Sequence, residues 1–271
     1  MPAVPCRPQI NILMNKILLG LTALALFFAS CKKEEVKPEP KPIEKIKLSE
    51  TTTTKNEKLT LWADESLVTG YHKLYLSVID PAGKNVNNAS VKFMPMMDMG
   101  TMKHSSPAEQ PVFNTTSGLY EGAVVFTMPS GAHAWMVNVT VNGEEKVLNV
   151  NIPDAKTKMV GSYVGTDGNK YVVALVPGKK WQVGMNDLEI LINKNESMMS
   201  FPAAADFKIV FNPEMPSMGH GSPNNVNPVS NGNGRYKGKV NYTMTGDWRL
   251  HFKLTRNDVV IVEDAVIDIL F

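Results

Sequence analysis

Two segments of the sequence place methionine and histidine close together. Residues 94–107 read MPMMDMGTMKHSSP, and residues 215–223 read MPSMGHGSP. The thioether of methionine is a soft ligand that selects Cu(I) over hard cations, and imidazole accepts both copper oxidation states and zinc. Both segments therefore predict a copper site, with Cu(I) favoured. The candidate metal ligands are Met97, Met102 and His104 in the first segment, Met215, Met218 and His220 in the second, and Met96 and Met99 as additional members of the first.

The spacing within the second segment suits a single ion. Met215 and Met218 lie three residues apart, and His220 follows two residues later. The intervening glycines allow the backbone to fold so that all three side chains point at one ion. The first segment is denser in methionine and contains proline, aspartate and glycine, so we expect it to form a loop. Two arrangements fit the sequence, with one ion in each segment or one ion shared by both.

A structural role is the alternative for these residues. Methionine fills irregular gaps, and a histidine in a loop commonly hydrogen-bonds to the backbone. Repetition of the pattern M-x-H-x-S-P in both halves of the chain favours metal binding over this alternative. Met128 and Met244 each end a predicted strand shortly before a tryptophan. We expect them to pack in the core, and the alternative is that they lie near the same edge and supply another sulfur.

The Met/His segments belong to an internal repeat. Residues 66–78, 91–95, 118–128 and 134–141 match residues 180–192, 209–213, 234–244 and 247–254, in the same order. A repeat at this period indicates two copies of one domain. We expect the copies to span residues 58–153 and 158–271.

Short alternating runs such as LTLWA, KLYLSVID and AWMVNVTV are separated by turn-forming residues throughout both copies. No window of twelve residues after position 31 carries a helical stripe, so the predicted fold class is all-β. About seven strands in about one hundred residues is the size of an immunoglobulin-like β-sandwich. Trp135 and Trp248 are expected to anchor the two cores, and His72, His133 and His251 are expected to be ordinary surface residues.

The first thirty residues predict a secretory signal. A short basic region follows Met14, where we expect translation to begin, and an apolar run leads to Ala29-Ser30-Cys31. This ending resembles the lipobox of bacterial lipoproteins, which implies cleavage and lipidation at Cys31; the alternative is an ordinary thiol behind a plain signal. Residues 31–57 are charged and proline-bearing, and we expect a disordered tether.

The stretch CKKEEV resembles the export signal of Bacteroidetes surface lipoproteins, here Lys33, Glu34 and Glu35. The resemblance implies an outer-membrane lipoprotein that is exposed at the cell surface or, without export, faces the periplasm. The alternative is that these charges only begin a solvated linker.

Composition excludes several function classes. The chain has 28 basic and 26 acidic residues, and removal of the signal takes away Arg7 and Lys16, which leaves 26 of each. A balanced charge argues against binding nucleic acid. Lipidation of Cys31 leaves no thiol for catalysis or for a zinc–cysteine site. Since the chain also lacks HExxH, GxSxG and a phosphate-binding glycine loop, we expect no enzyme.

The stretch from MPSMGHGSP through GRYKGKVNYTMTGDWRLHFKL resembles the YtkA-like domain, which is related to FixH-type proteins. Its members show an MPxMxH segment, a GxGxY turn, a strand and a TMxGxW hairpin. The resemblance is specific in the second copy and looser in the first, where PSGAHAW lengthens the final hairpin. It implies a small β-sandwich of the cell envelope that handles copper, and it points to the same six residues.

The sequence thus predicts an envelope lipoprotein that binds copper for buffering or for delivery to a protein partner. The competing hypothesis is a structural or adhesive surface module, in which tandem sandwiches carry methionine-rich loops for protein–protein contact.

Overall fold

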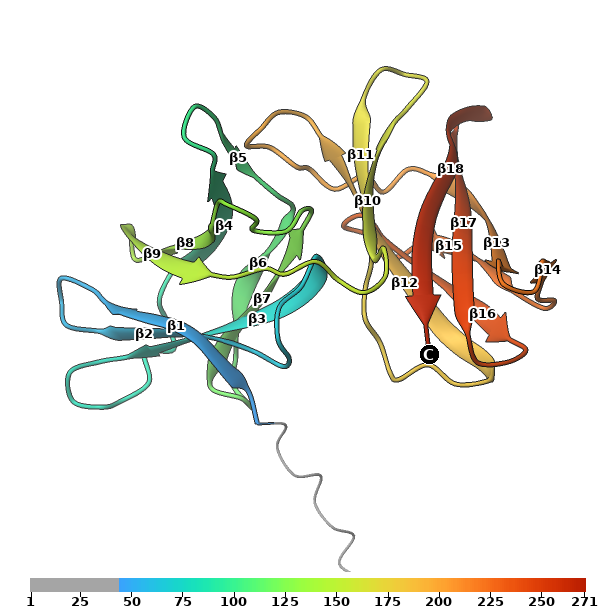
Figure 1. Cartoon of the computed structure of the whole chain (residues 1–271). Coiled ribbons are helices and arrows are strands. Elements are labelled where there is room, and N and C mark those ends of the chain that lie inside the picture. The colour runs from blue at the N-terminus through green and yellow to red at the C-terminus, as the bar shows by residue number, and fades with distance from the viewer. Residues whose placement is uncertain (1–43) are drawn as a thin grey trace, which may run out of the picture. The chain divides into compact units, whose positions relative to one another are not determined.

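The computed structural model describes residues 44–271, and within them all eighteen elements are β-strands (Figure 1). In that part of the chain no helix is long and apolar enough to cross a membrane. The predicted secretory signal, the predicted lipidation site Cys31 and the predicted export signal at Lys33, Glu34 and Glu35 lie outside the described residues.

The first nine strands form one β-sandwich. One sheet has the order β1-β2-β3-β7-β6, and the other has the order β5-β4-β8-β9. The strands are β1 (Ile46–Thr52), β2 (Lys58–Ala63), β3 (Gly70–Ile79), β4 (Val91–Asp98), β5 (Lys103–Ser105), β6 (Ala108–Asn114), β7 (Leu119–Phe126), β8 (Trp135–Val141) and β9 (Glu144–Val150).

The last nine strands repeat this topology, with one sheet of order β10-β11-β12-β16-β15 and one of order β14-β13-β17-β18. The strands are β10 (Val160–Val164), β11 (Lys170–Leu175), β12 (Gly184–Asn195), β13 (Lys208–Met215), β14 (His220–Gly221), β15 (Val226–Ser230), β16 (Arg235–Tyr242), β17 (Asp247–Arg256) and β18 (Val259–Leu270). Because every paired neighbour is antiparallel, the predicted all-β fold of two immunoglobulin-like sandwiches is confirmed.

Each sandwich encloses its own apolar core, and a tryptophan lies at the centre of each. Trp135 and Trp248 are both fully buried, as predicted. Each indole N–H donates a hydrogen bond to a carbonyl oxygen, that of Met128 at 2.9 Å and that of Met244 at 3.1 Å. Burying a tryptophan without such a partner would cost free energy, so there is a structural reason for the repeated order in which the dipeptide TM precedes a tryptophan, by seven residues in the first copy and four in the second.

The repeated glycine–tyrosine pairs form a second shared anchor. Gly118 and Gly234 have φ angles of 70° and 74°, a turn conformation that other residues rarely adopt. The buried hydroxyl of Tyr120 accepts a hydrogen bond from the Ala89 amide at 2.7 Å, and that of Tyr236 accepts one from the Phe207 amide at 3.0 Å. Both copies therefore have a tight turn followed by a buried aromatic residue.

The amino-terminal edge of the first sandwich differs from the prediction. The expected tether extended through residue 57, but residues 46–52 form β1, which pairs with β2 along its length. The prediction was wrong for these residues because their mostly polar side chains suit an exposed edge strand as well as a linker. Leu48 packs against the core, and Lys45 lies 2.8 Å from the carboxylate of Asp64.

His72 was predicted to be an ordinary surface residue, and this is wrong. It is buried on β3, with its Nε2 2.9 Å from the carbonyl oxygen of Val68. Its repeat partner Asn186 makes the equivalent contact four residues back, where its Nδ2 donates to the carbonyl of Gln182 at 2.7 Å. Both side chains thus close the loop that precedes the third strand of their sheet.

A third apolar cluster joins the five-stranded sheets of the two sandwiches. It contains Tyr71, Ala123, Val125, Val172, Ala174, Val176 and Leu191. At its border the guanidinium of Arg235 in the second sandwich forms a two-point ion pair with Glu109 of the first. The same guanidinium donates to Glu189 and to the hydroxyl of Tyr71, both at 2.7 Å.

Candidate functional site

Both Met/His segments fold as β-hairpins at equivalent positions of the two sandwiches. In the β4–β5 hairpin Met97 pairs with His104, and in the β13–β14 hairpin Met215 pairs with His220. The loop predicted for the first segment is therefore wrong for residues 94–98, which continue β4. The physical reason is the period of two, because Phe93, Pro95 and Met97 all point into the core.

A histidine, a methionine and a tryptophan lie close together in each sandwich, and in the first they form a row across the sheet. Met97 pairs with His104 on one side and with Trp135 on the other. Directly opposed residues of antiparallel strands share a face, so the three side chains lie together on the core side. The His104 and Trp135 rings meet edge to face with centroids 5.5 Å apart, and those of His220 and Trp248 are 6.1 Å apart.

The two imidazoles also share one hydrogen-bonding arrangement. Nδ1 of His104 lies 3.2 Å from the carbonyl oxygen of Ser105, and Nδ1 of His220 lies 3.1 Å from that of Gly221. A carbonyl only accepts, so we assign the proton of the neutral ring to Nδ1. The lone pair of Nε2 is then free, which is the usual state of a metal-binding histidine. Nε2 of His104 is buried and has no hydrogen-bond partner among the described residues.

The candidate methionines occupy different environments. Met97 and Met215 lie in the two cores with 2% and 5% of their surface exposed, whereas Met102 and Met218 are 48% and 60% exposed. The exposed pair is free to turn toward a ligand, because a thioether side chain has three rotatable bonds.

The additional candidates of the first segment do not share one position. Met96 follows Pro95 and precedes Met97 on β4, so its side chain lies on the sheet face opposite His104. Met99 is exposed in the turn, where its amide donates to the carbonyl oxygen of Met102 at 2.9 Å. The structure therefore brings Met97 and His104 together and places Met96 apart from them.

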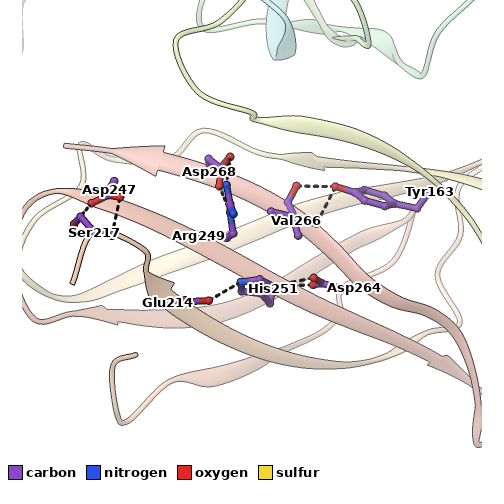
Figure 2. A network of polar contacts seen from close by, with 9 residues as sticks. All are labelled: Tyr163, Glu214, Ser217, Asp247, Arg249, His251, Asp264, Val266 and Asp268. Carbon is purple, nitrogen blue, oxygen red and sulfur yellow. Dashed lines mark hydrogen bonds and ion pairs between the residues drawn. The ribbon is translucent and has the colours of Figure 1, made fainter. Parts of the chain in front are cut away.

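The turn of the second hairpin is fixed from the neighbouring strand. Ser217 donates its hydroxyl to Asp247 at the start of β17, and its amide donates to the same carboxylate at 3.2 Å (Figure 2). The Ser217 hydrogen bond holds the pKa of Asp247 below its usual value. Gly219 has a φ of 63°, and its amide donates to the Met215 carbonyl at 2.9 Å. Gly219 thus supplies the left-handed conformation that this turn requires.

His251 is part of a charged array on the outer face of the same sheet. Its Nδ1 lies 2.9 Å from Asp264 on β18, and its Nε2 lies 3.2 Å from Glu214 on β13 (Figure 2). The prediction of an ordinary surface residue is therefore wrong. Glu214 takes the place that Met96 has in the first copy, so that position serves a cross-strand contact here instead of a thioether.

Two sets of methionines outside the Met/His segments are exposed, and sequence reasoning missed one of them, Met198 and Met199. Met128 and Met244 were expected in the core, but more than a third of each side chain is exposed. The backbone carbonyls of these residues hold the tryptophans, so the side chains are free to point outward. Met198 and Met199 lie exposed in the turn after β12. The available signal was the pair itself, because two adjacent methionines in the polar stretch NESMMS have no packing reason.

Within residues 44–271 no group of three or more histidine, cysteine, aspartate and glutamate side chains is placed to hold a metal ion.

Comparison with known families finds a match in the second sandwich. Residues 166–253 match the model of the YtkA-like family. The predicted resemblance is confirmed for this segment, which contains the whole β13–β14 hairpin and Trp248. No curated protein is similar enough in sequence to count as a relative.

Several solved structures resemble the chain distantly. The Escherichia coli adhesin FdeC is 15% identical over 82% of this chain and 66% of its own, with a TM-score of 0.28. The Yersinia pseudotuberculosis adhesin InvE is 14% identical over 81% of this chain and 60% of its own, with a TM-score of 0.29. The chain thus spans less than two thirds of either adhesin structure. These likenesses are too distant to indicate what this chain binds.

Proposed function

We propose that the protein binds copper, as Cu(I), through its two Met/His hairpins and serves copper buffering or delivery in the cell envelope. The observation that carries the proposal is duplicated in both sandwiches: a methionine pairs with the histidine across the hairpin, and the histidine ring lies against a buried tryptophan. In both copies Nδ1 of the histidine faces a backbone carbonyl, which leaves the lone pair of Nε2 free to bind a metal. Core packing alone gives no reason to repeat this arrangement beside an exposed methionine.

The donor set fits the ion. His104 with Met102, and His220 with Met218, supply an imidazole nitrogen and a mobile thioether, while Met97 and Met215 lie beside them on the core side. Thioether sulfur selects Cu(I) among the common envelope metals. Binding through neutral ligands would be reversible, and we propose no catalysis.

The cellular setting belongs to the same proposal and rests on the sequence. A lipid at Cys31 would attach the protein to the outer membrane, at the cell surface or facing the periplasm. A soluble or membrane partner would receive the metal. Mass spectrometry of the mature amino terminus and protease treatment of intact cells test the anchor and its exposure directly.

The test of metal binding is a competition titration with a chromophoric Cu(I) chelator. The full-length protein carries Cys6→Ser and Cys31→Ser, because thiolates would outcompete thioethers. We expect the protein to withdraw Cu(I) from the chelator. A variant with Met102→Leu, His104→Ala, Met218→Leu and His220→Ala is expected not to do so. Met185→Leu, which removes an exposed thioether from β12, is the matched control and should bind as the parent does.

Failure of the parent protein to compete would refute the copper proposal. The alternative would then be a surface module that uses its methionines for protein contact. Exposure of Met94, Met99 and Met102 around the first hairpin is the observation that favours this alternative. Parallel titrations with Cu(II) and zinc check the preference for the monovalent ion.

A further inference from the structure

A cavity of about 340 Å³ adjoins the first Met/His hairpin. Its lining includes Met102, His104 and Met128 from the first sandwich and Met198 from the turn that follows β12 in the second. Three thioethers and an imidazole therefore face one space. Two of these residues, Met128 and Met198, belong to neither Met/His hairpin.

The methionines around this cavity are mobile donors and not core residues. Met102, Met128 and Met198 are each between about two fifths and half exposed. A core methionine is buried at strand spacing, and none of these three meets that description. His104 supplies the fixed donor, because its ring is held by Trp135 and by the Ser105 carbonyl. Its buried Nε2 lacks a hydrogen-bond partner within the described residues, which would cost free energy unless something binds there.

The backbone holds Met198 beside the hairpin. The amide of Ser105, the residue after His104, donates a hydrogen bond to the carbonyl oxygen of Met198 at 2.7 Å. The turn itself is closed by the Glu196 amide, which donates to the Ser200 carbonyl at 3.0 Å. The position of Met198 is therefore set by the same strand that positions the imidazole.

The charge of the lining selects among metal ions. No aspartate or glutamate lines this cavity, and Lys170 does. The cost of moving an ion out of water rises with the square of its charge, so a divalent ion without an anionic ligand is strongly disfavoured. A monovalent soft cation carries a much smaller cost and is the ion that thioethers prefer. The lining thus suits Cu(I) better than Cu(II) or zinc.

From these contacts we propose that Met198 of the second sandwich completes the first copper site. Together with Met102, Met128 and His104 it forms a three-thioether, one-imidazole site for Cu(I) in this cavity. The inference rests on the proposed copper function and extends it, because it assigns two ligands outside the Met/His hairpins. It also makes the first site depend on both sandwiches, while the second hairpin has its own donors.

The test isolates the first site. In the cysteine-free full-length protein, Met218→Leu and His220→Ala silence the second hairpin. Cu(I) affinity is then measured by chelator competition for this parent, for Met198→Leu and for Met199→Leu. Leucine keeps the size and apolar character of methionine but has no donor atom, so the fold is retained. Circular dichroism and thermal unfolding of each variant verify this.

We expect Met198→Leu to raise the dissociation constant at least about tenfold, the smallest effect typical of even an outer-shell partner of a metal. Met128→Leu should act similarly, and Met199→Leu should leave the constant unchanged. Equal affinity in Met198→Leu and the parent, with binding still abolished by His104→Ala, would overturn this inference and leave the proposed function standing. Absence of Cu(I) binding in the parent would overturn both.

Discussion

At the residue scale, the imidazoles of His104 and His220 each have Nδ1 within hydrogen-bond distance of a backbone carbonyl, and Nε2 is available to bind a metal. The sequence repeat pointed to His104 and His220 through the pattern M-x-H-x-S-P, and the structure places them at the same register. The pattern could not predict the tautomer, because the accepting carbonyl belongs to the next residue and depends on the local backbone. It also could not separate buried Met97 from exposed Met102, since both precede the histidine in one methionine-rich run.

His72 supplies a prediction at the same scale. Burial lowers the pKa of this imidazole, although a hydrogen bond with the Val68 backbone opposes the shift. His72 therefore binds a proton more readily in the unfolded chain than in the folded protein. The contribution of neutral His72 to the free energy of unfolding is fully present above the ordinary histidine pKa of about 6.5. This contribution is lost as the pH falls from that value through the lower pKa of His72 in the folded protein.

We expect His72→Asn to remove this pH dependence, since Asn186 closes the equivalent loop in the second sandwich. Urea unfolding of the native protein and of the variant at pH 8 and pH 5 measures how the free energy of unfolding depends on pH. The native protein should lose more stability than the variant, by up to about 1.4 kcal/mol for each pH unit over which only the unfolded chain is protonated. Equal losses in both proteins would show that His72 does not titrate between the folded and unfolded states.

At the element scale, the strands that alternate in polarity were predictable and the edge strands were not. Strands such as β8, with Trp135 and three buried valines, could be predicted because apolar residues recur at every second position. β1 has mostly exposed residues and lies at an edge, so its composition is close to that of a linker. The β4–β5 hairpin was missed for a related reason, because Pro95 and Gly100 suggested a loop although Pro95 occupies an inward strand position.

β1 gives a prediction about truncation. A chain that begins at residue 56 lacks this strand and exposes the edge of β2, whereas a chain that begins at residue 44 retains it. We expect the shorter chain to be less stable by at least about 2 kcal/mol, because ladder hydrogen bonds worth about 1 kcal/mol each are lost together with the packing of Leu48. Thermal unfolding of the two chains measures the difference, and equal midpoints would show that β1 contributes nothing.

At the scale of the whole molecule, the two sandwiches meet through apolar side chains bordered by one ion-pair network. Arg235 contacts Glu109, Glu189 and Tyr71, and about a quarter of its side chain is exposed. Burial raises the pKa of Glu109, but hydrogen bonds from Arg235 and Tyr71 outweigh it and hold the pKa below its usual value. The sequence could not predict this ion-pair network, since Arg235 and Glu109 are 126 residues apart and no local pattern links them.

Substitution of Arg235 tests this junction. Arg235→Met keeps the aliphatic stem but removes the guanidinium from two partly buried carboxylates, so that Glu109 retains the Tyr71 hydroxyl and Glu189 retains Lys237 at 3.9 Å. We expect this loss to cost about 2–4 kcal/mol after allowance for solvent exposure. Faster proteolysis in the joining segment 152–158 and a lower unfolding midpoint are the expected results. Arg249→Met is the matched control, because it breaks the exposed pair with Asp268 within one sheet and should cost less than about 1 kcal/mol. Similar effects of both substitutions would contradict a special role for Arg235.

The central claim is that thioether and imidazole groups of these hairpins bind copper. X-ray absorption at the copper K-edge, on the cysteine-free protein loaded with Cu(I), tests it most directly because it identifies the bound atoms. We predict sulfur and nitrogen scatterers in the first shell, with loss of the sulfur signal when Met102, Met128, Met198 and Met218 are changed to leucine. A first shell of oxygen and nitrogen alone, or a sulfur signal that survives these substitutions, would contradict the account.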